Sequence, residues 1–382
     1  MTLKNTDQRL RIALVPPLWA RVATSTAGGV EYVVCLLADE LVRRGHDVTV
    51  FTSRDSTTAA GIEALCEWNF MEGIRRDVVK EYNYYESCNI AEALQKSASF
   101  DVLHFHLGCQ AIPFSVLSRA RVLHTLHNPV TPDPIWLLER YPNVPVTSVS
   151  RQQIAAIPAE RRRSIRVIHN ACNFDAYEFS ALPDKYLAFL GRMGAGKSPL
   201  EAIHIAREGG LPIVLAGQAL NNKERAYFTE KIEPLIDGRN VIHIGPVDHR
   251  EKNAFLKQAS ALLFPIEAEE AFGMVMIEAM ACGTPVLAFR RSAVEEVVDV
   301  GKTGFYADSV QELASLIPRA LALDRRVVRE HARQRFNHLR MVDEYLQSYE
   351  AILNGNWDRH AALGTDEGCS WETTGSAGRA IP

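Results

Sequence analysis

Short apolar segments alternate along this chain with longer segments in which apolar residues recur at helical intervals. Residues 11–16 form the first apolar segment, and Val30, Val34, Leu37 and Leu41 then follow at helical spacing. Strands and helices that alternate in this order are typical of a parallel, doubly wound α/β sheet.

The alternation occurs twice. Before the polar segment 177–184 we expect strands at 11–16, 47–52, 102–106, 122–125, 146–149 and 166–168. After it we expect strands at 186–190, 213–216, 241–244, 261–264 and 285–288. The pattern therefore predicts two Rossmann-like domains that face each other. Because ligands of open α/β sheets bind beyond the carboxyl ends of the strands, we expect the active site in the cleft between the domains.

Length and composition agree with two domains and exclude several classes of protein. At 382 residues the chain is too long for one ordinary hydrophobic core. Its 42 basic and 46 acidic side chains give a net charge of −4 and no general attraction to nucleic acid. The seven cysteines are scattered without a Cys-x-x-Cys, which argues against a disulfide framework or a zinc site. With no apolar signal core in residues 1–10 and no apolar run of about 18 residues, we expect a soluble, cytoplasmic protein without a transmembrane segment.

Two glutamates flank the start of a predicted helix in the second half of the chain. Gly273 begins the helix, the run from Met274 to Ala281 continues it, and Glu270 precedes it in a loop. At a rise of about 1.5 Å per residue, Glu278 lies roughly 7 Å along the axis from Gly273, comparable with the separation of the two sugars in a nucleotide-sugar. We expect one carboxylate to hold hydroxyls of the transferred sugar and the other those of the ribose. Free N–H groups at Gly273 and Met274 would meet other oxygens.

A glycine-rich turn at 191–198 has two interpretations. Its sequence Gly-Arg-Met-Gly-Ala-Gly-Lys-Ser satisfies the P-loop pattern between a predicted strand and a predicted helix, so a P-loop NTPase or kinase is the alternative function. Against it, Pro199 lacks an N–H, and no apolar strand ending in a metal-binding Asp follows. The planar fork of Arg192 and the compact charge of Lys197 also suit a diphosphate, and we favour this second interpretation.

Candidate residues on the N-terminal side also lie next to predicted strands or helices. Gly28 and Gly29 lead into a helix, so backbone N–H groups at its positive end can face an anion. His127 lies at a strand end, whereas His124 points into the strand and His106 is a weaker candidate for the cleft. No histidine has a partner at metal-ligand spacing and the chain lacks Asp-x-Asp, so we expect neither a metal nor another cofactor.

Together these segments resemble the motifs of the retaining glycosyltransferases of family 4, which have the GT-B fold. The string from Glu270 to Glu278 is similar to the family's glutamate-x7-glutamate signature, and the 191–197 segment to its Gly-Arg-x4-Lys segment. The stretch from Arg340 to Tyr349 resembles the family's C-terminal helix, which crosses back onto the first domain. The resemblance covers about residues 10–352.

The resemblance implies a hexosyltransferase that moves a sugar from a nucleotide-sugar to an acceptor hydroxyl with retention of the anomeric configuration. The implied catalytic residues are Arg192, Lys197, Glu270 and His127, and the implied substrate-binding residues are Gly28, Gly29, Phe272, Gly273, Met274 and Glu278. Arg192 and Lys197 hold the departing diphosphate, Glu270 and His127 orient the sugar, and Glu278 fixes the ribose. UDP-glucose is the expected donor, with GDP-mannose next. The expected acceptor is a small molecule, a glycan or a lipid-linked molecule, and not nucleic acid.

The chain departs from the family pattern at a few positions. Residues 23–26 stand where relatives carry an aromatic residue and a proline before the glycines. Ala171 and Asn173 replace a glycine and an aspartate, and Glu295 replaces a proline. The resemblance therefore implies no acceptor contact or ligand role at these positions.

The resemblance also sets the domain limits that we expect. Residues 1–178 form the acceptor-side domain, 179–340 the nucleotide-sugar-binding domain, and 341–355 a helix that crosses back to the first domain. Residues 356–382 are rich in Gly, Ser, Thr and Ala without periodicity, so we expect a disordered tail.

Two clusters of arginines fall outside these motifs. They comprise Arg161, Arg162, Arg163 and Arg166, and then Arg325, Arg326, Arg329 and Arg333. We favour solvated charged faces, with peripheral contact to an anionic membrane as the alternative.

Overall fold

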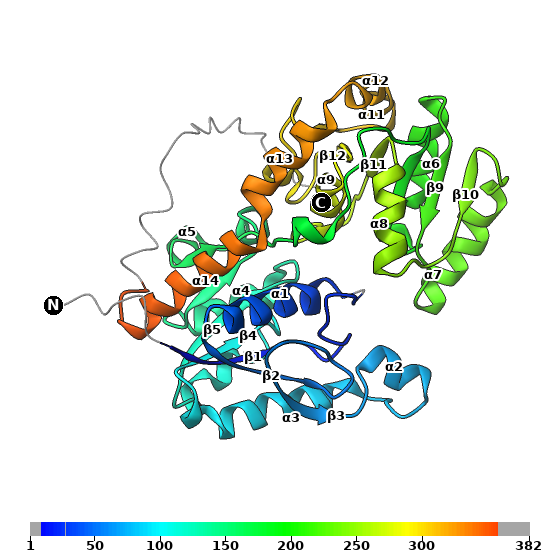
Figure 1. Cartoon of the computed structure of the whole chain (residues 1–382). Helices are drawn as coiled ribbons and strands as arrows, with labels where there is room; N and C mark the ends of the chain where they lie inside the picture. Colours follow the sequence, from blue (N-terminus) through cyan, green and yellow to red (C-terminus); the bar gives the residue numbers. More distant parts are fainter. Residues whose placement is uncertain (1–8, 27, 358–382) are drawn as a thin grey trace, which may run out of the picture.

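The computed structural model describes residues 9–26 and 28–357, which form two β-sheets with helices packed around them (Figure 1). The first sheet has seven strands in the order β3-β2-β1-β4-β5-β6-β7. Their bounds are β1 (Arg11–Val15), β2 (Asp47–Ser53), β3 (Gly61–Cys66), β4 (Val102–Phe105), β5 (Arg121–Leu126), β6 (Val146–Ser148) and β7 (Ile165–Val167). All neighbouring strands pair in parallel, as the alternating pattern predicts.

The second sheet repeats the same winding with six strands in the order β10-β9-β8-β11-β12-β13. Their bounds are β8 (Leu187–Leu190), β9 (Ile213–Ala216), β10 (Val241–His243), β11 (Ala261–Phe264), β12 (Val286–Phe289) and β13 (Gly304–Ala307). These strands are also parallel throughout. In each sheet the order reverses beside the first strand, and this is the point at which doubly wound sheets bind ligands.

Helices connect the strands in both sheets. Those of the first half are α1 (Gly29–Arg43), α2 (Phe70–Arg75), α3 (Tyr82–Gln95), α4 (Pro132–Arg140) and α5 (Ala159–Arg162), with the 3₁₀ helix η2 (Ile112–Leu117) between β4 and β5. Those of the second half are α6 (Pro199–Glu208), α7 (Asn222–Tyr227), α8 (His249–Gln258), α9 (Met274–Ala281), α10 (Val294–Val297), α11 (Val310–Ser315), α12 (Ile317–Leu321), α13 (Arg325–Phe336) and α14 (His338–Leu353).

Two strands are absent from the sequence prediction. β3 lies at the edge of its sheet, and none of its residues is buried, so it has no apolar run by which to recognise it. β13 begins at Gly304, directly after the polar segment 299–303, which has the composition of a loop. In contrast, β9 and β11 have the predicted bounds, because each is a central, fully apolar run.

α14 packs against the N-terminal sheet, although it follows α13 of the other half (Figure 1). Tyr345 and Tyr349 on this helix are fully buried. The Tyr349 hydroxyl lies 2.8 Å from His104 Nδ1, and that of Tyr345 lies 3.3 Å from Thr125 Oγ1. The helix is therefore held by hydrogen bonds in a buried setting, where an unpaired polar group is costly.

The arginine clusters are in large part structural, which corrects the favoured interpretation of solvated faces. Arg325 is buried and donates to the carbonyls of Ser180, Ala259 and Lys257. Arg329 likewise donates to carbonyls on two different segments, one before β8 and one at the end of α9. Arg161 is also buried. Guanidinium groups with several fixed donors suit this use, and these three side chains do not form a free cationic surface.

The chain stays packed at the start of the predicted tail. Trp357 is buried, its indole N–H donates to the Ser164 carbonyl at 2.9 Å, and the Arg166 guanidinium lies 4.2 Å from its ring centroid. The expectation of disorder is thus wrong at Trp357, while residues 358–382 lie outside the described residues. In the part of the chain that is described, no helix is long and apolar enough to span a membrane. The six cysteines described there are free thiols.

Candidate active site

A cleft of about 940 Å³ lies where loops after β1, β4 and β5 of one sheet meet loops after β8, β9 and β11 of the other. This is the position expected from the winding of the two sheets. All the candidate residues line it: Gly28, Gly29, His127, Arg192, Lys197, Glu270, Phe272, Gly273, Met274 and Glu278. Motifs far apart in the sequence therefore open onto one cavity.

Lys197 and Glu270 form an ion pair inside this cleft. Lys197 ends the turn after β8, and Glu270 lies in the loop between β11 and α9. About a quarter of each side chain is exposed, at 27% and 26%. The backbone N–H of Glu270 donates to the Ser292 hydroxyl at 2.9 Å, which holds the loop in place. A cation for an anionic ligand group thus stands directly beside an acceptor for hydroxyl groups.

Arg192 also contacts a carboxylate, that of Glu224, which was not predicted from the sequence. Its Nη1 lies 2.9 Å from Glu224 Oε1, with 52% of the Arg192 side chain exposed. Glu224 itself is held, because its Oε2 accepts from the Leu220 N–H at 2.8 Å. The only sequence signal for Glu224 is its position in the first turn of a short helix, where an acidic residue is common.

The start of α9 depends on the backbone of Gly273. This residue is the N-cap and has φ of +87°, in the left-handed region that favours glycine. A Cβ there would lie 2.7 Å from Met276 Cε and 2.8 Å from Phe264 Cζ. Gly273 thus precedes the helix that Met274 begins, and Met274 and Val275 of its first turn, where N–H groups lack intrahelical partners, line the cleft.

Glu278 lies on α9 as predicted, but it is buried and paired. Lys252 Nζ on α8 is 2.5 Å from its Oε1, and the Tyr177 hydroxyl donates to the same oxygen at 2.9 Å. The sequence analysis did not include Lys252 or Tyr177, because nothing local distinguishes either of them. The carboxylate is therefore fixed in position while still lining the cleft.

His127 is linked to a second histidine. Its Nε2 lies 2.9 Å from Nδ1 of His106, which is buried at the end of β4 and also lines the cleft. Burial lowers the pKa of His127 to about 3 and that of His106 well below its ordinary value, so both rings are neutral at pH 7. Since one nitrogen of this contact must donate and the other accept, His106 couples the tautomers of the two rings.

Gly28 and Gly29 open α1, with Gly28 as its N-cap. Glu31 lies behind this turn, where its Oε1 accepts from the Ala20 N–H at 2.9 Å. A Cβ on Gly28 would lie 2.2 Å from Glu31 Oε2, so only glycine leaves room for that carboxyl group. Burial raises the pKa of Glu31 to about 7. Glu31 is not among the residues predicted from the sequence, although it lines the cleft.

The charges of the cleft are divided between its walls. Among the described residues that line it, the lysines and arginines are Arg192, Lys197 and Lys252, all from the C-terminal half. The N-terminal wall carries the carboxyl groups of Glu31 and Glu86. The C-terminal wall alone suits a strongly anionic ligand group. The described residues contain no cluster of three or more His, Cys, Asp or Glu that could hold a metal ion.

Two family models match this chain and together span residues 27–335. Residues 27–176 match "Glycosyltransferase Family 4", and residues 175–335 match "Glycosyl transferases group 1". The second match includes the turn at 191–198, so the P-loop alternative finds no support. A D-inositol 3-phosphate glycosyltransferase from Mycolicibacterium smegmatis is 25% identical over 396 aligned residues, which cover 89% of this chain and 90% of that protein.

Solved structures with a similar fold include a sucrose-phosphate synthase and HepE. Sucrose-phosphate synthase from Thermosynechococcus elongatus has a TM-score of 0.71 at 20% identity, and the match covers 91% of this chain and 100% of the synthase chain. HepE from Anabaena, solved in complex with UDP-glucose, has a TM-score of 0.68 at 18% identity, and the match covers 89% of this chain and 100% of the HepE chain. This chain therefore belongs to glycosyltransferase family 4, the group 1 glycosyl transferases, and is a glycosyltransferase with the GT-B fold.

Proposed function

We propose that this enzyme moves a hexosyl group from a nucleotide-sugar to an acceptor hydroxyl with retention of the anomeric configuration. The contact between Lys197 and Glu270 carries the proposal, because it sets a cation for the diphosphate beside a carboxylate for the sugar hydroxyls. UDP-glucose is the donor to test first, since the HepE structure contains it, and GDP-mannose is the alternative.

In this proposal the donor diphosphate exchanges with the carboxylates that now contact Arg192 and Lys197. Both cations are accessible, with 52% and 27% of their side chains exposed, so this exchange requires no unfolding. The N–H groups at the start of α9 add partial positive charge next to the same space. Glu270, once released from Lys197, accepts hydrogen bonds from the transferred sugar.

Glu278 serves the ribose in the same scheme. Its contacts with Lys252 and Tyr177 leave its second oxygen for a ligand hydroxyl. Because these contacts fix the carboxylate before the ligand binds, less conformational entropy is lost on binding. His127 is neutral, so it can hydrogen-bond a sugar hydroxyl without introducing a charge.

Transfer proceeds on one face of the sugar. The bond between the anomeric carbon and the diphosphate oxygen breaks, while Arg192 and Lys197 stabilise the charge that develops on the leaving group. The acceptor oxygen then bonds to the anomeric carbon from the same side, and its proton passes to the departing diphosphate oxygen. The configuration is retained because both bonds lie on that face.

The test is a panel of UDP-, GDP- and ADP-sugars with the full chain, in which mass spectrometry follows nucleotide release and NMR assigns the anomer of the product. We expect release from UDP-glucose that EDTA leaves unchanged, because the scheme uses Arg192 and Lys197 as counter-charges. Arg192→Ala and Lys197→Ala should each lower kcat by roughly 100-fold. Arg207→Ala, on the exposed face of α6, is the matched control and should leave kcat unchanged.

Several outcomes would overturn this proposal. One is a product of inverted configuration, and another is wild-type kcat in both cleft variants. Magnesium-dependent ATP hydrolysis that is lost in Lys197→Ala but not in Glu270→Ala would instead revive the P-loop function.

A further inference from the structure

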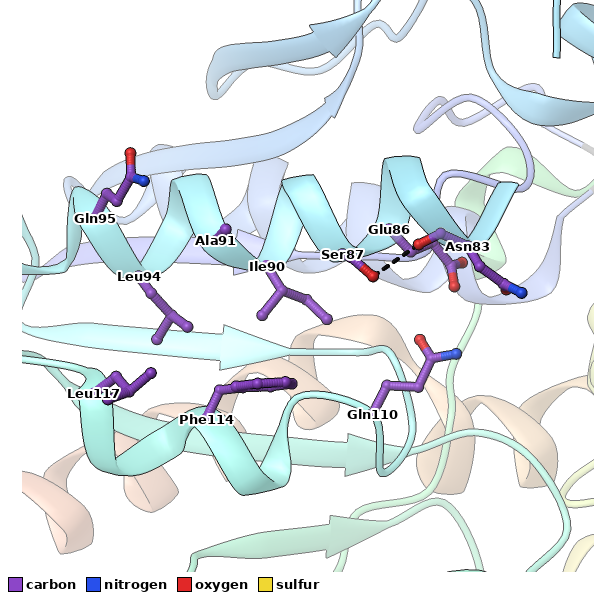
Figure 2. A pocket seen from close by; sticks show the side chains of 10 residues that line it. All are labelled: Asn83, Glu86, Ser87, Ile90, Ala91, Leu94, Gln95, Gln110, Phe114 and Leu117. Carbon is purple, nitrogen blue, oxygen red and sulfur yellow. Dashed lines mark hydrogen bonds between the residues drawn. The ribbon is translucent and has the colours of Figure 1, made fainter. Parts of the chain in front are cut away.

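A second pocket, of about 630 Å³, lies beside the cleft between α3 and η2. Figure 2 shows the side chains of Ile90 and Leu94 on α3 pointing toward Phe114 and Leu117 on η2. Phe114 and Leu117 are 45% and 64% exposed, although both are large and apolar. An exposed apolar surface of this kind, in a recess next to an active site, is typical of a ligand-binding site.

This side pocket, lined by α3 and η2, adjoins the cleft. Glu86 and Gln110 line both cavities. In Figure 2 these two polar side chains stand at one end of the pocket, and Leu94 and Leu117 stand toward the other. A molecule that entered from the cleft would therefore meet polar groups first and apolar groups farther in.

The charges that line the side pocket and the cleft decide what kind of molecule fits. The described residues that line the side pocket include no lysine or arginine, and the N-terminal wall of the cleft has none either. Glu86 is the charged residue of the pocket, and burial raises its pKa. An acceptor with a phosphate or carboxylate here would lack a counter-charge and would lie near Glu86 and Glu31.

We propose that the side pocket holds the apolar arm of an uncharged acceptor, whose hydroxyl end lies in the cleft next to Glu86 and Gln110. This inference rests on the proposed function, because the donor groups Arg192, Lys197 and Glu278 all lie on the opposite wall. The acceptor is thus an amphiphile such as an alkyl or aryl glycoside or alcohol, and differs in charge from an inositol phosphate.

Binding is measured first, without turnover. Isothermal titration compares methyl and hexyl β-D-glucopyranoside, the latter below its micelle concentration, with the full chain in the presence and absence of UDP. We expect the hexyl glycoside to bind at least tenfold more tightly, because its added methylene groups leave water for the pocket. Equal affinities for the two glycosides would overturn the proposal. Failure of UDP to bind would instead count against the proposed donor site, and the glycoside comparison stands without it.

Variants then assign the difference to the pocket. Leu117→Ser removes an apolar wall and Ala91→Trp fills the space, and both positions are exposed, so the fold should tolerate the changes. Each should abolish the preference for the hexyl glycoside while leaving methyl glycoside and UDP affinities unchanged. Val116→Ser is the matched control, because Val116 is 76% exposed on the same helix and does not line the pocket.

Two further comparisons separate the alternatives. Glucose 6-phosphate should bind more weakly than the methyl glycoside, and tighter binding would contradict the uncharged class. Phosphatidylcholine vesicles test whether the exposed side chains serve a membrane. Vesicle binding that Leu117→Ser abolishes, in a protein with no preference for the hexyl glycoside, would assign this surface to lipid and overturn the proposal.

Discussion

At the scale of single residues, each cation of the cleft contacts a carboxylate. The exposed fractions of the side chains indicate which of these ion pairs can exchange partners when a ligand binds. In the pair of Arg192 and Glu224, about half of the arginine side chain is exposed. Exposed ion pairs of this kind contribute only about 0–1 kcal/mol to the free energy of unfolding. A donor diphosphate can replace that carboxylate at little cost. Lys252 and Glu278 are 16% and 8% exposed, so this pair is harder to separate. We infer that Arg192 changes partner during binding and that Glu278 does not.

The buried pair supports a prediction on stability. Glu278→Leu leaves Lys252 without its carboxylate in a largely buried position, and we expect a loss of about 3–5 kcal/mol of unfolding free energy in urea. The double variant Glu278→Leu with Lys252→Met should recover most of that loss, since neither charge is left unpaired. Neither variant should bind UDP well in calorimetry. Recovery of UDP affinity along with stability would contradict the assignment of Glu278 to the ribose.

The carboxyl group of Glu31 predicts a dependence of stability on pH. Burial raises its pKa from 4.5 to about 7, so the folded state favours the protonated form. Its contribution is therefore complete below pH 4.5 and is lost as the pH rises through 7, by roughly 3 kcal/mol in total.

Glu31→Gln should remove this contribution, so the difference in unfolding free energy between wild type and variant should change between pH 5 and pH 8. Urea titrations at the two pH values measure it. The wild-type/variant difference cancels the opposite trend from the buried histidines, whose lowered pKa values cost stability as the pH falls. Parallel pH profiles in the two proteins would disprove the prediction.

At the scale of elements, α9 and the loop before it carry the two glutamates, with Glu270 in the loop and Glu278 on the helix. Its eight residues are almost all apolar and six are buried, so the helix is held by packing between the sheet and α13. Gly273, with its positive φ, is the N-cap of this helix, and Met274 and Val275 of the first turn line the cleft. The backbone conformation of Gly273 thus determines where α9 begins.

Gly273→Ala should therefore weaken both the fold and the donor site. The methyl group would meet Phe264 and Met276 in addition to the strain of positive φ, and we expect about 2–4 kcal/mol of destabilisation and tenfold weaker UDP binding. Gly301→Ala is a matched control, since its φ is +76° but nothing lies within 4 Å of the added carbon. It should cost only the strain, about 1–2 kcal/mol. Equal losses in both variants would mean that packing at Gly273 is unimportant.

At the scale of the whole molecule, α14 returns the chain from the second sheet to the first. Its buried tyrosines reach His104 and Thr125 on β4 and β5, the strands that lead to His106 and His127 in the cleft. The contact of Ser150 Oγ with the Ala271 carbonyl, at 2.7 Å, joins the halves again next to the cleft. The N-terminal and C-terminal walls of the cleft are therefore connected in two places, by α14 and by the hydrogen bond between Ser150 and Ala271.

Tyr349→Phe tests the tie made by α14. The variant leaves His104 Nδ1 without its partner in a fully buried position, so we expect a loss of about 1–3 kcal/mol in unfolding free energy. Tyr84→Phe, at a position that is 66% exposed, should change stability little. Differential scanning calorimetry of both variants measures the difference. A Tyr349→Phe protein as stable as wild type would show that this hydrogen bond contributes nothing to the packing of the helix.

Local patterns in the sequence determined most of the elements and named the candidate site residues. The burial pattern of an element depends on residues that are neighbours in the sequence. The central strands β9 and β11 and the helix Met274–Ala281 could therefore be predicted from the sequence alone. The motif at 191–197 identifies Arg192 and Lys197 as candidate cations, because residue type and spacing within a short segment are both visible in the sequence. Edge strand β3 escaped detection because none of its residues is buried, so it lacks the apolar run that marks a buried strand.

Only the tertiary structure decided which groups meet. Lys197 and Glu270 are 73 positions apart. The contacts of Arg192 with Glu224, of Glu278 with Lys252 and of His127 with His106 also join separate segments of the chain. These contacts depend on the path of the chain through two sheets, which no local pattern encodes. The same holds for the arginines that proved structural and for the side pocket, because each is made by segments that folding brings together.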